Sequence, residues 1–252
     1  VTTDLPFACN APFVQDPARV KIKDPETSPT NRWLLHRAGE LAAKALLAWV
    51  GDETLDADKR AKAYSLLSDV DREDNSLEGS CAATIEQAID DTLGESRFLM
   101  TEGGGLVARE ECQTVPQLLL DVWSHDQVAA FFADEEQAIL SRCVSSSDRK
   151  KLANWGCVDT VAKSDVIEVL EAKHLPRPGS WRQLMMLWAY ISGEVSAHRY
   201  YSSHTDVKVV PVQGRDVLYA AGEVVRLGEK KLLQSEEDWN FLAQHLLVLN
   251  QN

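Results

Sequence analysis

The stretch SPTNRWLLHRAGELAAKALLAWVG, residues 28–51, carries the clearest structural signal in this chain. Ser28 is a favoured N-cap residue, and Pro29 suits the first helical position because its missing N–H group has no partner there in any case. Apolar residues then recur at steps of three and four: Trp33, Leu34, Leu41, Ala45, Leu46, Trp49 and Val50. The pattern predicts a long helix that buries this stripe and ends at Gly51.

Periodicity of the same kind predicts that most of the chain is helical. Further helices are expected at about residues 57–67, 79–93, 116–140, 149–155, 165–172 and 181–191, and after Ser235. Residues 3–14 contain two prolines and are expected to form an edge strand or an extended segment, and residues 19–23 are a candidate second short strand. Two domains are expected, residues 1–95 and 96–252.

Two short segments predict β-hairpins. In residues 97–108 and 207–220, apolar runs flank a turn, and the first turn contains Gly103-Gly104-Gly105. A phosphate-binding loop is the alternative for such glycines, but no Lys-Ser or Lys-Thr follows and the neighbouring glutamates would repel a phosphate. The expected fold class is therefore α+β, predominantly helical with short strands and two β-hairpin units.

The segments on the C-terminal side of the two hairpins resemble each other. Ala108-Arg109-Glu110 comes after the first hairpin and Ala221-Gly222-Glu223 comes after the second, and helical material is next in both cases. An internal repeat and a chance similarity both explain this pattern, and the residues alone do not decide between them.

The composition excludes several classes of function. The 252 residues carry 39 acidic and 26 basic side chains, a formal net charge of -13. Nucleic-acid binding is therefore not expected, because such proteins concentrate lysine and arginine on one face. No stretch is apolar for the roughly 18 residues that a membrane span needs, and the first residues lack a basic region followed by an apolar run, so a soluble, cytoplasmic protein without a membrane partner is expected.

The cysteines and the first residue give two weaker expectations. Five cysteines at wide spacing, without a CxxC pair, indicate reduced thiols and no zinc site. The chain begins with Val1, as an excised piece of a longer protein or a processed product would.

No self-sufficient active site is expected. The nucleophile motif G-x-S-x-G is absent. Adjacent carboxylates occur at 90–91, 110–111 and 135–136, but they fall on predicted helix surfaces or turns, where solvated charge is the ordinary explanation. The chain is therefore expected to be no enzyme on its own and to hold neither a metal ion nor a cofactor.

A family resemblance lies near the N-terminus. LPFACNAPF at residues 5–13, DPAR at 16–19 and SPTNRW at 28–33 resemble the region just downstream of the nucleotide site in sacsin-like ATPases of the GHKL class, which includes heat-shock chaperone ATPases. A looser likeness continues at residues 210–214 and 223–225. The resemblance implies a non-catalytic middle, or transducer, region of a larger bacterial multidomain ATPase. Its partners would be the upstream ATPase domain, which binds Mg-ATP, and a protein partner or client.

The resemblance also singles out Arg19. In this class the region after the nucleotide domain lends a basic residue to ATP when the lid closes, so Arg19 is a candidate γ-phosphate-contacting catalytic residue; a plain surface arginine is the alternative. The loop at residues 14–17 differs from the serine- and asparagine-rich sacsin version. Two other functions stay open: a stand-alone acidic protein–protein interaction or scaffold module without an ATPase link, and an enzyme whose site is not recognised.

Overall fold

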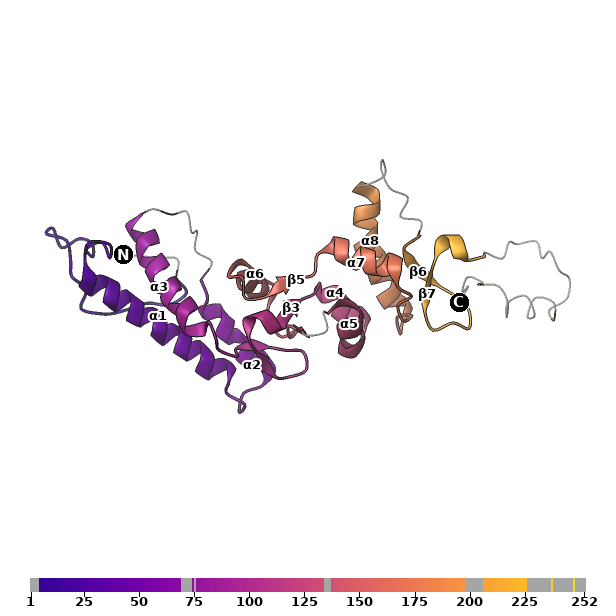
Figure 1. Ribbon diagram of the computed structural model, residues 1–252, viewed down its shortest axis with the longest axis horizontal. Coiled ribbons are helices and arrows are strands. Elements are labelled where there is room, and N and C mark those ends of the chain that lie inside the picture. The colour runs from indigo at the N-terminus through magenta and orange to yellow at the C-terminus, as the bar shows by residue number, and fades with distance from the viewer. Residues whose placement is uncertain are drawn as a thin grey trace. The chain divides into compact units, whose positions relative to one another are not determined.

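The computed structural model describes residues 5–68, 74, 76–133, 137–197, 206–225, 237 and 247. The fold is α+β, as predicted: helices predominate, and the strands are two to four residues long (Figure 1). The chain forms two compact units, each made from two stretches of sequence. Unit 1 comprises residues 1–114 and 135–160, and unit 2 comprises residues 115–134 and 161–252.

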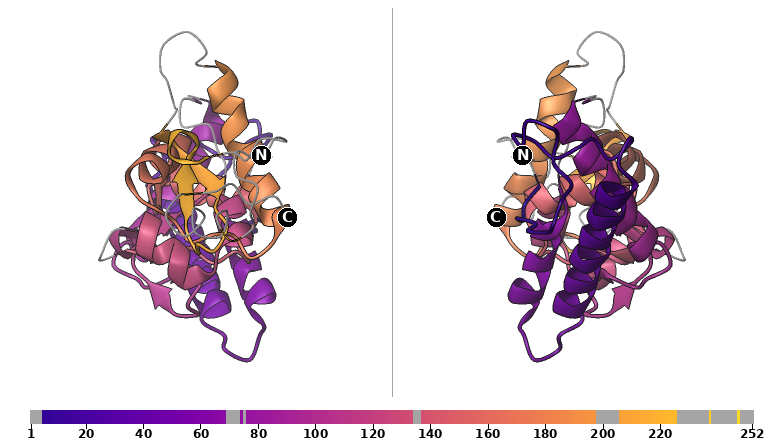
Figure 2. Two further views of the ribbon diagram at one scale, coloured as in Figure 1. Left: turned by 90° about the vertical axis from the view of Figure 1, so that its right-hand side faces the viewer. Right: turned by 90° about the vertical axis from the view of Figure 1, so that its left-hand side faces the viewer.

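Helix α1 (Pro29–Val50) begins and ends as predicted, and the hydroxyl of Ser28 accepts the N–H of Asn31 at 3.4 Å. It packs along α3 (Leu77–Leu93), beside which it runs in Figure 2. The contact is close at Gly39, where an added Cβ would lie 2.7 Å from the Cβ of Ala88. Small side chains thus decide which face of α1 meets α3.

This packing corrects the predicted stripe of α1. Trp33 and Leu41 were expected in the core, but they are 61% and 67% exposed. The buried face lies to one side of the predicted stripe, because only a face with small residues at its centre allows the close approach to α3. It consists of Asn31, Leu35, Gly39, Ala43, Leu46 and Val50.

The rest of the unit 1 core joins segments on both sides of residue 95. Helix α2 (Ala57–Ala61) leads into the 3-10 helix η1 (Lys62–Leu66), which contains the fully buried Tyr64. The Tyr64 hydroxyl donates to the carbonyl of Phe98 at 2.7 Å and accepts the N–H of Met100 at 2.8 Å. The expected domain boundary at residue 95 therefore falls inside unit 1.

Both predicted hairpins are present. Strands β1 (Leu99–Met100) and β2 (Leu106–Val107) pair antiparallel in unit 1, as do β6 (Lys208–Pro211) and β7 (Leu218–Ala220) in unit 2. The first turn needs glycine, because Gly104 has a φ of 89°. The glycine run is thus a hairpin turn, as predicted.

The two hairpins also end alike. Each runs into a single 3-10 turn, η2 (Arg109–Glu111) or η4 (Ala221–Glu223). The carboxylate of Glu111 accepts the N–H of Ala108 at 3.1 Å, and that of Glu223 accepts the N–H of Ala220 at 2.9 Å. The structural match therefore pairs Ala108 with Ala220, one residue away from the pairing that the sequence suggests.

A small parallel sheet in unit 1 was not predicted. Strand β3 (Cys112–Thr114) lies between β4 (Ala138–Ile139) and β5 (Asp159–Thr160) and is parallel to both. The helix expected at 116–140 consists instead of α4 (Gln117–Val122) and α5 (His125–Phe132), and β4 follows later in the chain. Strands of two or three residues are too short to show a period of two in the sequence.

The remaining described helices lie where they were expected. They are α6 (Ser146–Asn154) in unit 1, and α7 (Lys163–Ala172) and α8 (Trp181–Ala197) in unit 2. The unit 2 core comes from α4, α5, α7, α8 and β7, with Leu119, Val122, Val128, Val166, Leu170, Leu187 and Leu218 among its buried residues.

Three further predictions concern the N-terminal segment, the helix after Ser235 and membrane-spanning helices. The described residues of the predicted edge strand or extended segment at 3–14 form no strand. Of the short strand expected at 19–23, only Ile22 pairs, through a single antiparallel bridge to Gln15. The helix expected after Ser235 lies outside the described residues, apart from Glu237 and Leu247. Among the residues that the structure describes, no helix has the length and apolar character needed to cross a membrane.

Candidate functional site

The segment from Val14 to Lys23, here called the Arg19 loop, is a narrow loop that precedes α1. Its two arms pair through the bridge between Gln15 and Ile22. The N–H of Lys23 donates to the carbonyl of Val14 at 2.8 Å, and the N–H of Asp16 donates to the carbonyl of Lys21 at 2.9 Å. The loop therefore has a defined backbone although it contains no regular strand.

Asn31 fixes the base of this loop to the first turn of α1. Its side-chain oxygen accepts the N–H of Val14 at 2.7 Å, and its side-chain nitrogen donates to the carbonyls of Val14 at 2.8 Å and Lys23 at 2.6 Å. Asn31 is fully buried, so these bonds lie away from water. One side chain thus holds both arms of the loop on the helix.

Asp16 organises the tip of the loop. Its carboxylate accepts the N–H groups of Val20 at 2.9 Å and Lys21 at 3.3 Å, and its carbonyl accepts the N–H of Arg19 at 2.9 Å. Arg19 has a φ of 56°, a left-handed conformation that costs a residue with a side chain about 1 kcal/mol. The surrounding hydrogen bonds hold Arg19 in this conformation.

The Arg19 side chain itself is exposed, and it forms no ion pair with the described part of the chain. Its neighbour Lys21 lies 3.7 Å from Glu78 of α3. The loop therefore offers a free guanidinium, whose planar fork matches the geometry of a phosphate or carboxylate. The Asp16 carboxylate of the same loop accepts two backbone N–H groups at its Oδ1 atom and forms no ion pair with Arg19.

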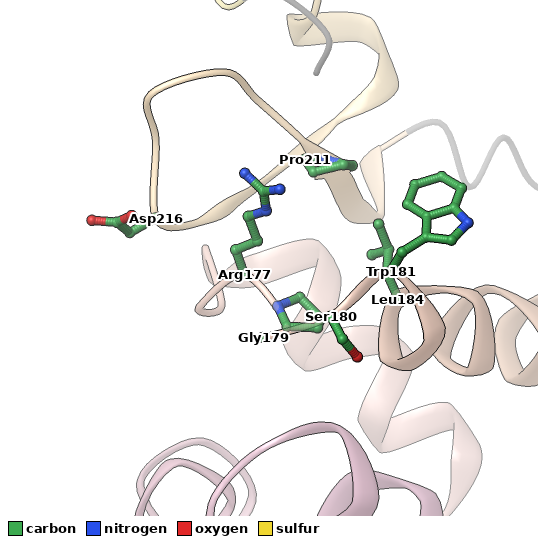
Figure 3. A pocket seen from close by; sticks show the side chains of 8 residues that line it. Arg177, Gly179, Ser180, Trp181, Leu184, Pro211 and Asp216 are labelled. Carbon is green, nitrogen blue, oxygen red and sulfur yellow. The ribbon is translucent and has the colours of Figure 1, made fainter. Parts of the chain in front are cut away.

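A second candidate lies in unit 2, at the start of α8. This pocket, here called the Arg177 pocket, has a volume of about 460 Å³ (Figure 3). Sequence reasoning missed it, because residues 174–180 have the composition of a linker. Its lining residues are Arg177, Pro178, Gly179, Ser180, Trp181, Leu184, Pro211 and Asp216.

Hydrogen bonds to the hairpin β6–β7 shape the Arg177 pocket. The N–H of Arg177 donates to the carbonyl of Asp216 at 2.7 Å, the N–H of Leu218 donates to the carbonyl of Leu175 at 2.9 Å, and Pro176 bridges to Val217. The expected linker thus runs as a third extended segment beside β7. No motif in the sequence indicates this, since the pairing forms only in the folded chain.

A further cavity, of about 500 Å³, lies in unit 1, and most of the side chains that line it are apolar. Cys9 and Cys81 contribute two thiols to its lining. Burial raises the pKa of Cys81 to about 11 and also raises that of Cys9, so both thiols stay protonated at neutral pH. The cavity lining is Leu5, Pro6, Phe7, Ala8, Cys9, Phe13, Ile22, Leu35, Cys81 and Ile85.

In each described acidic pair that was expected to be solvated charge, one carboxylate forms an ion pair. Asp90 lies 2.6 Å from Arg109, and Glu111 lies 2.7 Å from Arg97. The pair at 135–136 lies outside the described residues. Within the described ranges, no three His, Cys, Asp or Glu side chains gather in a group that would hold a metal ion.

Comparison with protein-family models, with curated proteins and with solved structures finds no match for this chain. Its function is therefore inferred from the two polar candidates, the Arg19 loop and the Arg177 pocket, and from the resemblance in residues 5–33. Of the two, only the Arg19 loop includes a residue that the sequence predicted as functional.

Proposed function

We propose that this chain is a middle, transducing region of a larger cytoplasmic ATPase of the sacsin-like GHKL class. In this proposal an upstream domain binds and hydrolyses Mg-ATP, and its closure is coupled through this chain to a protein partner or client. The chain is not an enzyme on its own. The proposal rests on one observation: hydrogen bonds hold the Arg19 loop on α1 with the guanidinium of Arg19 exposed and unpaired.

The geometry of the loop suits this role in two respects. First, the hydrogen bonds of Asp16 and Asn31 fix the backbone on both sides of Arg19, so little backbone freedom is lost when the guanidinium meets an anion. An arginine placed against the γ-phosphate stabilises the charge that develops during phosphoryl transfer. The loop would therefore supply this guanidinium to the nucleotide site of the upstream domain.

Second, the same bonds give a route for transmission. Because Asn31 belongs to the first turn of α1, a displacement of the loop by the nucleotide domain would act directly on that helix. Helix α1 packs along α3 over much of its length, so both helices would move together. The loop would thus couple the state of the nucleotide to the packing of unit 1.

The test is ATP turnover by the full-length protein with Arg19→Ala. We expect kcat to fall by about tenfold or more, because a charge-stabilising contact in the transition state is lost. Asn31→Ala, which releases the loop, should reduce kcat in the same direction. Arg37→Ala is the matched control, because Arg37 is an exposed arginine of α1 that pairs with Glu40, and it should leave turnover unchanged. An unchanged kcat in Arg19→Ala contradicts the proposal.

A second candidate function is a stand-alone acidic interaction or scaffold module without an ATPase link. It is favoured by large apolar side chains at the surface: Trp33 and Leu41 on α1, and Trp181 and Met185 on α8. The sequence encoded upstream of Val1 discriminates between the two candidates. A GHKL nucleotide-binding domain there supports the first, and an unrelated domain supports the second.

A further inference from the structure

We infer that the Arg177 pocket binds an acidic peptide segment of a partner protein, with a carboxylate on Arg177 and a bulky apolar side chain against Trp181. This inference names the chemistry of the partner that the proposed function requires. The inference does not depend on the ATPase proposal, however, because all the residues from which it is argued lie in unit 2.

The charge of the pocket favours an acidic partner. Figure 3 shows the guanidinium of Arg177 directed into the pocket and the carboxylate of Asp216 pointing away from it. Arg182 and Arg215 are exposed next to the lining residues Trp181 and Asp216. None of these three arginines forms an ion pair within the part of the chain that is described. Of the two charged residues that line the pocket, Arg177 therefore faces into it and Asp216 does not, so the charge presented to a ligand is positive, on a chain whose net charge is -13.

The exposed apolar surface formed by Trp181 and Met185, here called the apolar wall, favours a peptide over a small free anion. Trp181 is 58% exposed, and Met185, one turn further along α8, is 52% exposed. A small anion would contact Arg177 and leave this surface in water, whereas a peptide would cover both. Tryptophan, arginine and methionine are also enriched at the energetically dominant positions of protein interfaces.

The wall is held in place before any partner binds. The ring of Trp181 packs edge-on against that of Trp188 with centroids 5.3 Å apart, and the indole N–H of Trp188 donates to the carbonyl of Val209 at 2.9 Å. The backbone of Arg177 is fixed by its bond to Asp216. Because these groups are already ordered, binding loses less conformational entropy. The pocket volume of about 460 Å³ accommodates one large side chain.

The test is fluorescence anisotropy with the whole chain and a labelled synthetic peptide in which three acidic residues flank a central tryptophan on each side. We expect a Kd of about 10 to 100 µM that weakens as salt is added, because the contact is partly ionic. Replacing the acidic residues by their amides, or the tryptophan by serine, should weaken binding about tenfold.

Variants of the protein locate the site. Arg177→Gln and Trp181→Ser should each weaken binding of the acidic tryptophan peptide about tenfold, and since both residues are exposed the fold is retained. Arg37→Gln, at an exposed arginine in unit 1, is the control and should leave the Kd unchanged. Three results would each overturn the inference. They are unchanged peptide binding in Arg177→Gln, a Kd above about 1 mM for the wild-type chain, and binding of a ten-nucleotide oligothymidylate as tight as that of the peptide.

Discussion

At the scale of single residues, three buried polar side chains organise unit 1. Asn31 holds the Arg19 loop on α1, and Tyr64 ties η1 to the strand β1. Arg149 of α6 donates to the carbonyls of Val144 at 3.0 Å and Ser141 at 2.7 Å and to the hydroxyl of Thr114 at 2.9 Å. Each joins segments far apart in sequence, so its loss would leave buried backbone groups without partners.

Tyr64 makes the stability of the chain depend on pH. Burial raises its pKa above the ordinary value near 10, because a phenolate is poorly solvated in the core. The unfolded chain therefore releases this proton first as the pH rises, and the free energy of unfolding falls above about pH 10. We expect Tyr64→Phe to reduce this alkaline slope by about 1.4 kcal/mol per pH unit.

The same substitution lowers stability at neutral pH. Tyr64→Phe leaves the carbonyl of Phe98 and the N–H of Met100 unpaired, which should reduce the free energy of unfolding by about 1 to 3 kcal/mol at pH 7. Urea unfolding at pH 7, 10 and 11 measures both effects. Ser65→Ala, at the exposed neighbouring position, should keep the wild-type slope. An alkaline slope in Tyr64→Phe equal to that of the wild type would refute this assignment.

At the scale of elements, α1 buries one apolar face and leaves two large apolar side chains on its charged face. One face, with Gly39 and Ala43 at its centre, packs on α3. Another carries Trp33 and Leu41 and stays exposed. Leu35, Leu46 and Val50 supply the apolar area of the buried face, while Gly39 and Ala43 allow its close approach to α3, because close packing of helices depends on shape as well as on hydrophobicity. The pattern of small residues therefore selects the buried face.

Gly39→Ala tests this role of shape. In an exposed helix the change would stabilise by about 1 kcal/mol, but here the new methyl group overlaps the carbonyl oxygen of Ile85 and the Cβ of Ala88. We expect a net loss of about 1 to 3 kcal/mol in the free energy of unfolding, measured with urea. Gly94→Ala, where the added Cβ meets nothing closer than 3.6 Å, is the control and should change stability by less than about 0.5 kcal/mol. A stabilised Gly39→Ala variant would show that the helices do not approach this closely.

At the scale of the whole molecule, the chain builds each unit from two separate stretches. Residues 135–160 return to unit 1 and supply β4, α6 and β5. The central strand β3 pairs with β4 and β5 from this returning stretch. Unit 1 is therefore complete only when the chain has been made as far as residue 160.

Fragments of the chain test this organisation. Residues 1–95 lack the partners of Tyr64 and much of the core, so this fragment should show no cooperative unfolding transition by circular dichroism. Residues 1–160, which contain all of unit 1, are the comparison and should unfold cooperatively. A cooperative transition in the 1–95 fragment would restore the boundary expected from the sequence. The core residues that the shorter fragment lacks include Phe98, Leu99, Met100, Cys112, Leu140, Leu152, Trp155 and Cys157.

Local signals in the sequence determined the α+β class, both hairpins and the described helices other than the division of residues 116–140 into α4, α5 and β4. The cap at Ser28, the period of α3 and the glycines before β2 act over a few residues, so they can be read without knowing the fold. Tertiary structure alone decided the parallel sheet, the buried face of α1 and the Arg177 pocket. Each of these depends on contacts between distant residues, such as Cys112 with Ala138 or Arg177 with Asp216. No local pattern encodes such contacts, because they exist only once the chain has folded.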